Sequence, residues 1–327
     1  MRAFVVSDAS GELTLGVRDA QLAPRDETDI LVKVDFSSVN FKDAMVATSP
    51  SRVRRVDTLI GGVDAAGTVR ASLDEAYSPG DRVIVVGGAL GVARDGGFAQ
   101  YVYAPSRYLT KLPATLSTRD AMTIGTAGYT AMASVLALED HGLSPESEVL
   151  VTGATGGVGS QALTYLALKG YRPVASTGSL EEAAWLEARG ATRVIGRDDV
   201  SDRADRVLGS ELWAGAIDCV GGPTLASILR SLRYGGAVAA SGLVASPELS
   251  TTVYPFITRA VALIGIDAVE ATPATRERVW QALGAIAHLV DFSKFVDREI
   301  PLDDLGGALE DIRGGATRGR VLVRLYD

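Results

Sequence analysis

A glycine-rich turn carries the clearest chemical signal in the sequence. Gly153, Gly156 and Gly159 stand three apart in VLVTGATGGVG, between a short β-branched run and an apolar segment. Glycines there permit positive φ and let the backbone approach a pyrophosphate, and the amino end of a following helix offers unpaired N–H groups. The pattern is GxxGxxG instead of GxGxxG, and it predicts a strand, a turn and a helix at 160–169 that bind a dinucleotide. The alternative is a turn that needs glycine only for its own geometry.

The end of the next expected strand, 173–177, bears on which dinucleotide binds. An acidic residue about 20 residues past the glycine turn would hold the ribose hydroxyls of NAD. This chain has Ser176-Thr177-Gly178-Ser179 there, and hydroxyls without a carboxylate suit a 2′-phosphate. Arg197, just beyond the third expected strand, is a candidate counter-charge, and a solvated arginine beside two aspartates is the alternative. The sequence therefore predicts NADPH.

Metal-ligating residue types are scarce. Cys219 is the single cysteine, which excludes an internal disulfide and fits a reducing compartment, and we expect it to be a small buried side chain. The two histidines, His141 and His288, have no metal-ligand spacing to another candidate. We therefore expect no metal site.

Tyr165 and Lys169 form a Tyr-x-x-x-Lys pair, the catalytic spacing of short-chain dehydrogenases. They lie on the helix that directly follows the glycine turn and must pack on the sheet, whereas that chemistry places the pair much later in the chain. We interpret the spacing as a coincidence.

Length and composition indicate a globular protein of two domains. The chain has 327 residues, of which 47% are hydrophobic and 22% charged. Its net charge of −8, with Lys and Arg scattered, disfavours a nucleic-acid surface. The N-terminal apolar run is too short for a signal peptide, and no run of about 18 apolar residues occurs. We expect a cytoplasmic protein that does not enter a membrane.

The expected elements change in kind near Pro113. Before it, short strands alternate with turns, which predicts an all-β domain, a small barrel, with short helices at 42–47 and 50–56. After it, helices and nearly continuous apolar strands alternate, which predicts a doubly wound parallel sheet. The expected strands there are 149–152, 173–177, 193–195, 214–220, 237–241 and 261–266. A tail with helices at 275–289 and 302–312 and a strand at 320–325 is expected to return to the first domain.

This layout and eight sequence segments in order resemble the zinc-independent acrylyl-CoA reductase and quinone oxidoreductase group of the medium-chain dehydrogenase/reductase superfamily. The segments, which extend from Ser37 to the last strand, are SSVNFKDAM, DAAGTV, IGTAGYTAM, VTGATGGVGS, WAGAIDCVGG, TTVYPFITR, LIGIDAV and RGRVLV. The resemblance implies an α/β protein with an N-terminal GroES-like β-barrel domain and a Rossmann domain with a doubly wound parallel sheet. Residues 1–113 and 269–327 would form the GroES-like catalytic domain and 114–268 the Rossmann NADP-binding domain.

The resemblance also implies site residues. Asn40, Lys42 and Asp43 match the family sequence Asn-Tyr-Lys-Asp and are candidate catalytic residues; Phe41 replaces the tyrosine, so a phenolic hydroxyl is missing. The alternative is that Lys42 and Asp43 only cap the helix that follows. The implied cofactor contacts are Phe41, Thr155, Gly156, Gly157, Val158, Thr177, Gly178, Ser179, Arg197, Leu243, Ile257 and Ala268.

Zinc-dependent members of the superfamily carry an early cysteine ligand and a Gly-His-Glu segment, where this chain has 40–43 and Gly62-Val63-Asp64. Without zinc, no Lewis acid polarises an alcohol or ketone oxygen, so we expect an activated C=C as substrate. The expected function is NADPH-dependent reduction of an α,β-unsaturated carbonyl, with acrylyl-CoA as an example. The alternatives are a quinone or enone reductase and a non-catalytic NADPH-binding protein.

The strand at 261–266 comes after the Rossmann order is complete and is expected at the sheet edge. In the resembling family this strand pairs with its symmetry mate across a two-fold axis, which implies a homodimer.

Overall fold

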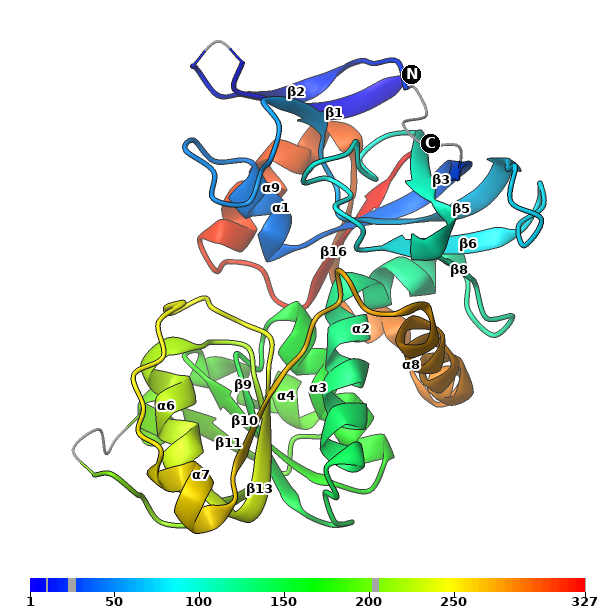
Figure 1. Cartoon of the computed structure of the whole chain (residues 1–327). Helices are drawn as coiled ribbons and strands as arrows, with labels where there is room; N and C mark the ends of the chain where they lie inside the picture. Colours follow the sequence, from blue (N-terminus) through cyan, green and yellow to red (C-terminus); the bar gives the residue numbers. More distant parts are fainter. Residues whose placement is uncertain (10, 23–27, 202–205, 327) are drawn as a thin grey trace. The chain divides into compact units, whose positions relative to one another are not determined.

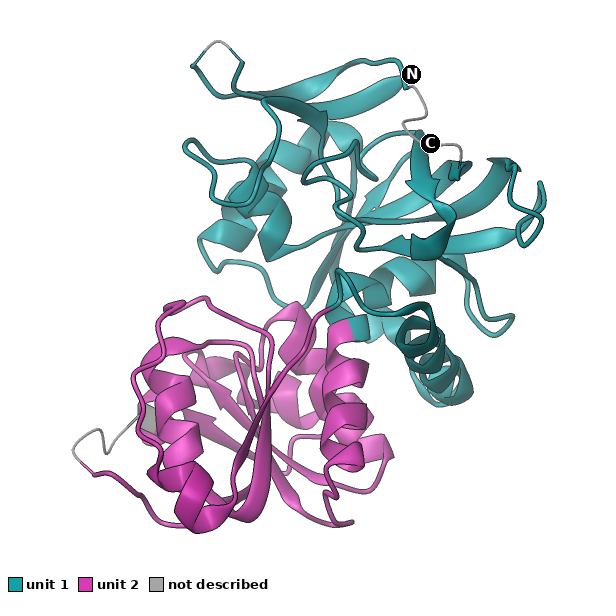
Figure 2. Cartoon of the chain, viewed as in Figure 1, with its two compact units in different colours: residues 1–129, 268–327 teal, residues 130–267 magenta. Residues whose placement is uncertain are grey.

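The computed structural model forms two compact units (Figure 2). It describes residues 1–9, 11–22, 28–201 and 206–326. Unit 1 contains residues 1–129 and 268–327, and unit 2 contains residues 130–267. The division falls inside one long helix, α2 (Thr118–Asp140). The domain limits expected from the sequence, at 113/114 and 268/269, remain a prediction.

Unit 1 is built mainly of antiparallel strands (Figure 1). A three-stranded sheet has the order β2-β1-β4, and a seven-stranded sheet has the order β15-β16-β3-β5-β6-β8 with β7 paired to β3. Alternate side chains of these strands, such as Val32, Val34 and Val83, fill the core of the unit. The strands are β1 (Arg2–Ser7), β2 (Thr14–Asp19), β3 (Asp29–Val39), β4 (Thr58–Ile60), β5 (Asp64–Ala71), β6 (Arg82–Val86), β7 (Tyr101–Pro105), β8 (Leu109–Lys111), β15 (Val296–Pro301) and β16 (Arg320–Arg324).

The carboxyl-terminal strand completes this unit. β16 pairs antiparallel with β3, so that Val321 lies opposite Val39 at the end of β3. Helix α1 starts directly after β3, and Arg320 at the start of β16 therefore lies beside the start of α1. The helices of unit 1 are α1 (Phe41–Val46), α8 (Pro273–Ile286), α9 (Leu305–Arg313) and the first part of α2, with 3₁₀ turns at Ser106–Tyr108, Ala287–Leu289, Phe292–Phe295 and Leu302–Asp304.

Unit 2 is a six-stranded parallel sheet of order β11-β10-β9-β12-β13-β14 with helices on both faces (Figure 1). The central strands are buried along nearly their whole length, as strands covered on both faces must be. The expected GroES-like plus Rossmann fold class is thus confirmed. The elements are β9 (Glu148–Thr152), α3 (Gly157–Leu168), β10 (Arg172–Thr177), a 3₁₀ turn (Leu180–Glu182), α4 (Ala183–Glu187), β11 (Arg193–Gly196), α5 (Arg197–Ser201), β12 (Trp213–Asp218), α6 (Gly222–Ser231), β13 (Leu232–Ala240), α7 (Tyr254–Arg259) and β14 (Ala262–Gly265).

The strand order reverses between β9 and β12. From β9 the chain winds outward through β10 to β11, and it then crosses to β12 and winds through β13 to β14. In such sheets ligands bind outside the carboxyl ends of the strands at the reversal. The glycine turn follows β9 and therefore lies at this point.

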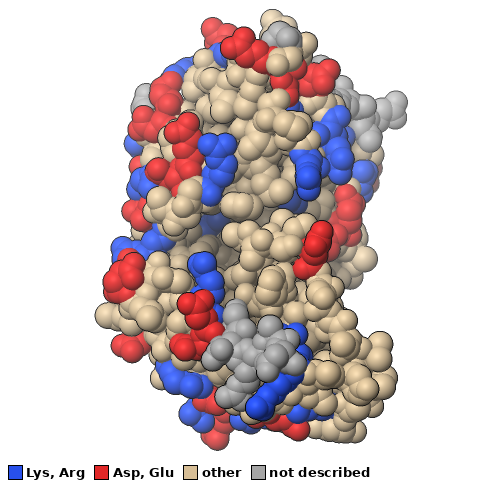
Figure 3. Space-filling model, turned by 90° about the vertical axis from the view of Figure 1, so that its left-hand side faces the viewer, with Lys and Arg blue, Asp and Glu red and all other residues tan. Residues whose placement is uncertain are grey.

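Helix α2 is broken at Gly125, where φ is 52° and ψ is −161°. Of the described residues, only this helix is long and apolar enough to cross a membrane, but 83% of the apolar window is buried inside the protein. A helix that is buried to this extent is typical of a protein core. On the face drawn in Figure 3, basic and acidic side chains are interspersed, without a continuous basic surface.

Candidate functional site

The glycine turn brings the backbone of β9 close to the start of α3. Gly153 has φ +60°, and a Cβ added to Gly159 would lie 2.5 Å from the carbonyl oxygen of Gly153. Any side chain at Gly159 would thus push the helix away from the strand. Thr155 and the residues to Val158 are half-buried, so a ligand can reach them. The first N–H groups of α3 have no acceptor within the helix and can donate to an anion.

The ends of β10 and β11 form the second part of the site. Thr177 lies opposite Gly196 in the parallel register, so Arg197 starts α5 beside the end of β10. A Cβ on Gly178 would lie 2.6 Å from Nη2 of Arg197, which means that the guanidinium rests against the Gly178 backbone. The N–H of Ser179 donates to the hydroxyl of Thr177 at 3.0 Å. A guanidinium beside backbone and hydroxyl groups, with no carboxylate at 176–179, fits the 2′-phosphate of NADP.

A buried carboxylate fixes the two strands at the reversal point. The hydroxyl of Thr152 donates to Oδ1 of Asp218 at 2.6 Å and accepts from the N–H of Cys219 at 3.1 Å. The N–H of Gly221 donates to Oδ2 of Asp218 at 2.8 Å. Burial raises the pKa of Asp218, against the effect of these hydrogen bonds. This support for the crevice was not predicted from the sequence, although an aspartate at the end of an apolar strand is a signal for it.

Cys219 is a free cysteine at the end of β12. Loss of solvation, followed by the charge of Asp218, raises the pKa of its thiol to about 12. A raised pKa favours the protonated thiol at neutral pH. The expected full burial is not observed, because Cys219 is half-buried at the end of β12.

The last three implied cofactor contacts are Leu243, Ile257 and Ala268. Leu243 lies beyond the carboxyl end of β13, at the same edge of the sheet as the glycine turn. Ala268 follows the carboxyl end of β14 and is grouped with unit 1. Ile257 lies elsewhere. It is on α7, where Arg259 donates to the carbonyls of Arg230 and Leu232, at the amino end of β13.

Ile257 and the glycine turn are thus at opposite edges of one parallel sheet. The structure therefore places Ile257 away from the glycine turn, and its expected contact with the cofactor remains a prediction. The location of Ile257 at the amino end of the strands was not predicted from the sequence.

Helix α1 carries the candidate catalytic residues of unit 1. Asn40 and Asp43 are buried, and Lys42 is half-buried. No hydrogen bond or ion pair joins the Lys42 ammonium to any residue that the structure describes. The amide of Asn40 donates to Asp64 at 2.8 Å and accepts from Arg320 at 3.0 Å, so this side chain is held by protein groups.

Asp43 caps the start of α1. Its Oδ2 accepts from the N–H of Asn40 at 2.8 Å, and its Oδ1 accepts from the N–H of Val63 at 2.9 Å. The alternative of a capping role is thus confirmed for Asp43. Asp43 does not face Lys42, because adjacent helix residues point in different directions. Burial, and then the negative charge of Asp64, raises the pKa of Asp43 to about 7.

The Tyr165 and Lys169 pair is structural. The Tyr165 hydroxyl donates to Gln161 at 2.7 Å, and the Lys169 ammonium donates to Glu139 at 2.9 Å. The two side chains therefore bind different partners, as a coincidence of spacing would predict.

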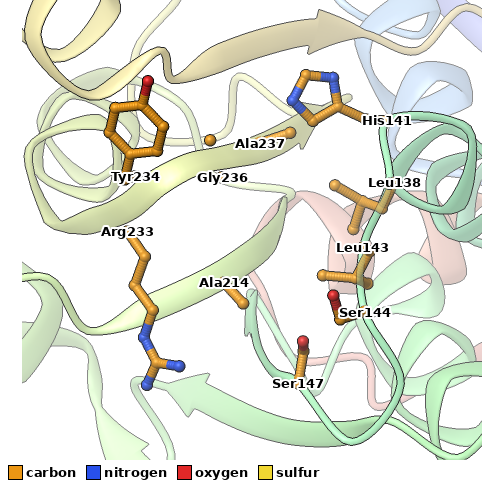
Figure 4. Close-up of a pocket in the computed structure, with 12 residues that line it drawn as sticks. Leu138, His141, Leu143, Ser144, Ser147, Ala214, Arg233, Tyr234, Gly236 and Ala237 are labelled. Atoms are coloured by element: carbon orange, nitrogen blue, oxygen red, sulfur yellow. The ribbon is translucent and has the colours of Figure 1, made fainter.

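A separate pocket of about 340 Å³ lies between the end of α2 and the starts of β12 and β13 (Figure 4). Leu138, His141, Arg233 and Tyr234 line it with neighbouring residues. This is the amino edge of the sheet, so the pocket is distinct from the dinucleotide crevice. His141 lies in it without a cysteine or second histidine among its lining residues.

Two family models match the chain. The alcohol dehydrogenase GroES-like domain matches residues 26–114, and the zinc-binding dehydrogenase family matches residues 157–285. The acrylyl-CoA reductase AcuI of Ruegeria pomeroyi is 42% identical over 317 residues, which are 97% of this chain and 96% of that protein. The Bacillus subtilis protein YhfP, named as a quinone oxidoreductase, is 46% identical over 297 residues, 90% of each chain.

This chain is a medium-chain dehydrogenase/reductase. It belongs with the acrylyl-CoA reductases and quinone oxidoreductases of that superfamily, and it is an oxidoreductase. The YhdH oxidoreductase of Salmonella enterica in complex with NADP has a TM-score of 0.94 at 39% identity, with 100% of both chains covered. YhfP of Bacillus subtilis with NAD bound has a TM-score of 0.95 at 43% identity, with 99% of both chains covered.

The residues of this chain do not fit a zinc site, although one matched family model is described as a zinc-binding dehydrogenase. Asp43 and Asp64 accept hydrogen bonds from protein N–H and O–H groups. Residues 40–43, at the place of the early cysteine ligand, contain no cysteine or histidine. Among the described residues, no cluster of three or more His, Cys, Asp or Glu side chains could hold a metal ion. The residues needed for a tetrahedral zinc site are thus missing from the places where it would be built.

We expect activity to survive exhaustive chelation, and elemental analysis of the purified protein to find far less than one zinc per chain. The control is a zinc-dependent alcohol dehydrogenase treated in the same way, which should lose its activity. One zinc per chain that leaves together with activity would contradict this prediction.

Proposed function

We propose that this protein uses NADPH to reduce the C=C bond of an α,β-unsaturated carbonyl compound, and that a short enoyl-CoA thioester such as acrylyl-CoA is its substrate. The observation that carries the cofactor assignment is the Arg197 guanidinium against the Gly178 backbone, at a strand end without a carboxylate. NADPH supplies a hydride when it is bound. Thr155, Gly156, Gly157 and Val158 would hold its pyrophosphate, and Thr177 to Ser179 with Arg197 its 2′-phosphate.

The reaction leaves negative charge on the carbonyl oxygen of the substrate after the β-carbon has been reduced. A hydrogen-bond donor aimed at that oxygen lowers the barrier most when it has no other partner. The half-buried Lys42 ammonium has no partner among the described residues, whereas Asn40 and Asp43 are occupied by other groups. We assign the donor to Lys42 and the α-carbon proton to water.

Reduction of a quinone is the second candidate, because YhfP, at 46% identity, is named for that activity. A substrate panel separates the two. NADPH oxidation is followed by absorbance with acrylyl-CoA, crotonyl-CoA, a simple enone and a quinone. A kcat/KM for acrylyl-CoA at least tenfold above the others supports the proposal, a preference for quinone supports the second candidate, and NADPH binding without turnover indicates a non-catalytic protein.

We further propose a cytoplasmic homodimer formed through β14. This strand is at the edge of its sheet, and Leu263 on it is 39% exposed. An exposed apolar edge is an aggregation risk unless it is covered. Pairing of β14 with its symmetry mate would cover it and join two sheets.

Light scattering at micromolar concentration should give the mass of two chains for the wild type, and that of one chain for Ile264→Lys, because a buried charge at the paired edge is costly. Leu73→Lys, at a site that is 85% exposed in unit 1, is the control and should remain dimeric. A wild-type monomer would rule out the assembly.

A further inference from the structure

Asp64, at the start of β5, is a fully buried carboxylate that several elements share. Its Oδ2 accepts from the hydroxyl of Ser38 at 2.7 Å, from the amide of Asn40 at 2.8 Å and from the N–H of Thr126 at 2.9 Å. Its Oδ1 accepts from the hydroxyl of Thr126 at 2.5 Å. A buried carboxylate is tolerated only when its oxygens are satisfied and its charge is balanced.

Arg320, at the start of β16, provides the balancing charge. Its Nη2 lies 3.6 Å from Oδ2 of Asp64, and both side chains are almost completely buried. The guanidinium donates to the Ser38 hydroxyl at 2.6 Å and to the Asn40 amide oxygen at 3.0 Å. Ser38 and Asn40 therefore each bridge the two charges, as donor to Asp64 and as acceptor from Arg320.

Gly125 makes room for this pair. A Cβ at this position would lie 2.5 Å from Nη2 of Arg320, 2.6 Å from Oδ2 of Asp64 and 2.7 Å from the Ser38 hydroxyl. The positive φ of Gly125 breaks α2 at this point, which frees the N–H of Thr126 for Asp64. The ion pair thus holds the start of α1 through Asn40 and the start of the second half of α2 through Thr126.

We propose that Arg320 and Asp64 are positioning residues for the reduction: their buried ion pair clamps the Asn40 amide and so fixes the helix turn that carries Lys42. This inference rests on the proposed role of Lys42. Lys42 follows Asn40 by two residues in the first turn of α1, so a shift of Asn40 moves the ammonium directly. A displacement of about 1 Å at a catalytic group can cost 10²-fold in rate.

The charge of Asp64 also reaches Asp43, the other carboxylate at this helix start. Of the groups around Asp43, β5 supplies Asp64, β16 supplies Arg320 behind it, and Lys42 is the neighbour on α1. Helix α9, which packs on α1, turns Leu305, Ala308 and Leu309 to the core and keeps Glu310 and Arg313 exposed. Asp43 has a pKa near 7, and its protonation weakens the cap of α1, so kcat should fall as the pH falls through this range.

The test compares Arg320→Lys and Asp64→Asn with the matched control Arg324→Lys, on the same strand but in the half-exposed pair with Glu299. Lysine keeps the charge but loses the planar fork, so Arg320→Lys should lower kcat about tenfold or more while KM for NADPH stays within about twofold. Asp64→Asn removes the like charge beside Asp43, so the acidic limb of the kcat profile should move to lower pH by about half a unit or more. Arg320→Lys should not move the acidic limb of the kcat profile, and Arg324→Lys should change neither kcat nor this limb.

Two measurements do not need turnover. The pH titration of the ¹³C-labelled Asp43 carboxyl should shift to lower pH in Asp64→Asn. In Arg320→Lys, hydrogen exchange of the α1 amides should be accelerated relative to the wild type, and by more than that of the α9 amides. Wild-type kcat in Arg320→Lys, equal losses in kcat and NADPH affinity, or an unmoved Asp43 titration in Asp64→Asn would each overturn the inference. A wild-type protein that reduces no enoyl substrate would instead refute the proposed function, and the titration and exchange would still decide whether the ion pair controls α1.

Discussion

Replacement of Lys42 by alanine is expected to lower kcat by about 10² to 10³, the usual loss on removing one donor to a developing oxyanion. The ammonium has no partner among the described residues, so its loss removes an interaction with the substrate without leaving a buried group unsatisfied. NADPH affinity should stay within a few-fold, because Lys42 lies in unit 1 and the proposed phosphate contacts lie in unit 2. Steady-state kinetics and direct titration of NADPH measure the two effects.

Lys42→Arg should keep part of the rate, since the charge and donors remain. Lys111→Ala, which removes an exposed lysine from β8, is the control and should leave kcat unchanged. If single-turnover hydride transfer in Lys42→Ala runs at the wild-type rate, Lys42 only shapes α1, and the donor must be a backbone N–H or a hydroxyl of the cofactor ribose.

Arg197→Ala is expected to weaken NADPH about tenfold to a hundredfold, the range for a hydrogen bond to a charged group. NADH lacks the 2′-phosphate and should bind to the variant as it does to the wild type. Titration of each cofactor by fluorescence or calorimetry gives both dissociation constants.

Arg193→Ala is the matched control, because Arg193 lies at the amino end of β11 near Glu148, away from Gly178. It should alter neither affinity. Equal losses for NADPH and NADH in Arg197→Ala would mean that the arginine supports the fold of the loop, and the phosphate site would have to lie elsewhere.

The sequence predicted the parts of the site that depend on backbone conformation. The β-branched run, the glycines and the apolar segment predicted a strand, a turn and a helix, and β9, the turn that starts at Gly153 and α3 follow one another in that order. The meeting of Thr177 with Arg197 also follows from local order, because the ends of consecutive parallel strands lie side by side. The edge position of β14 followed from the winding order in the same way.

The sequence did not predict contacts between distant segments. Arg320 and Asp64 are 256 residues apart, and neither charge is unusual until β16 pairs with β3. A signal was present, since each charge comes directly before a short apolar run at the start of its strand, VLV after Arg320 and AAG after Asp64. The short elements β15 and α7 were also not predicted. The helix expected at 50–56 is wrong, because this segment is a turn in which the Ser51 hydroxyl accepts from the N–H groups of Val53 and Arg54.

The central claim is that the hydride of NADPH is delivered to the β-carbon of an enoyl thioester. The most direct test is reduction of acrylyl-CoA with NADPH deuterated at the nicotinamide C4, followed by NMR of the propionyl-CoA formed. We predict one deuterium at the β-carbon from one of the two C4 faces, and a proton from solvent water at the α-carbon. Deuterium at the α-carbon, or no consumption of acrylyl-CoA by a protein that readily reduces quinones, would contradict it.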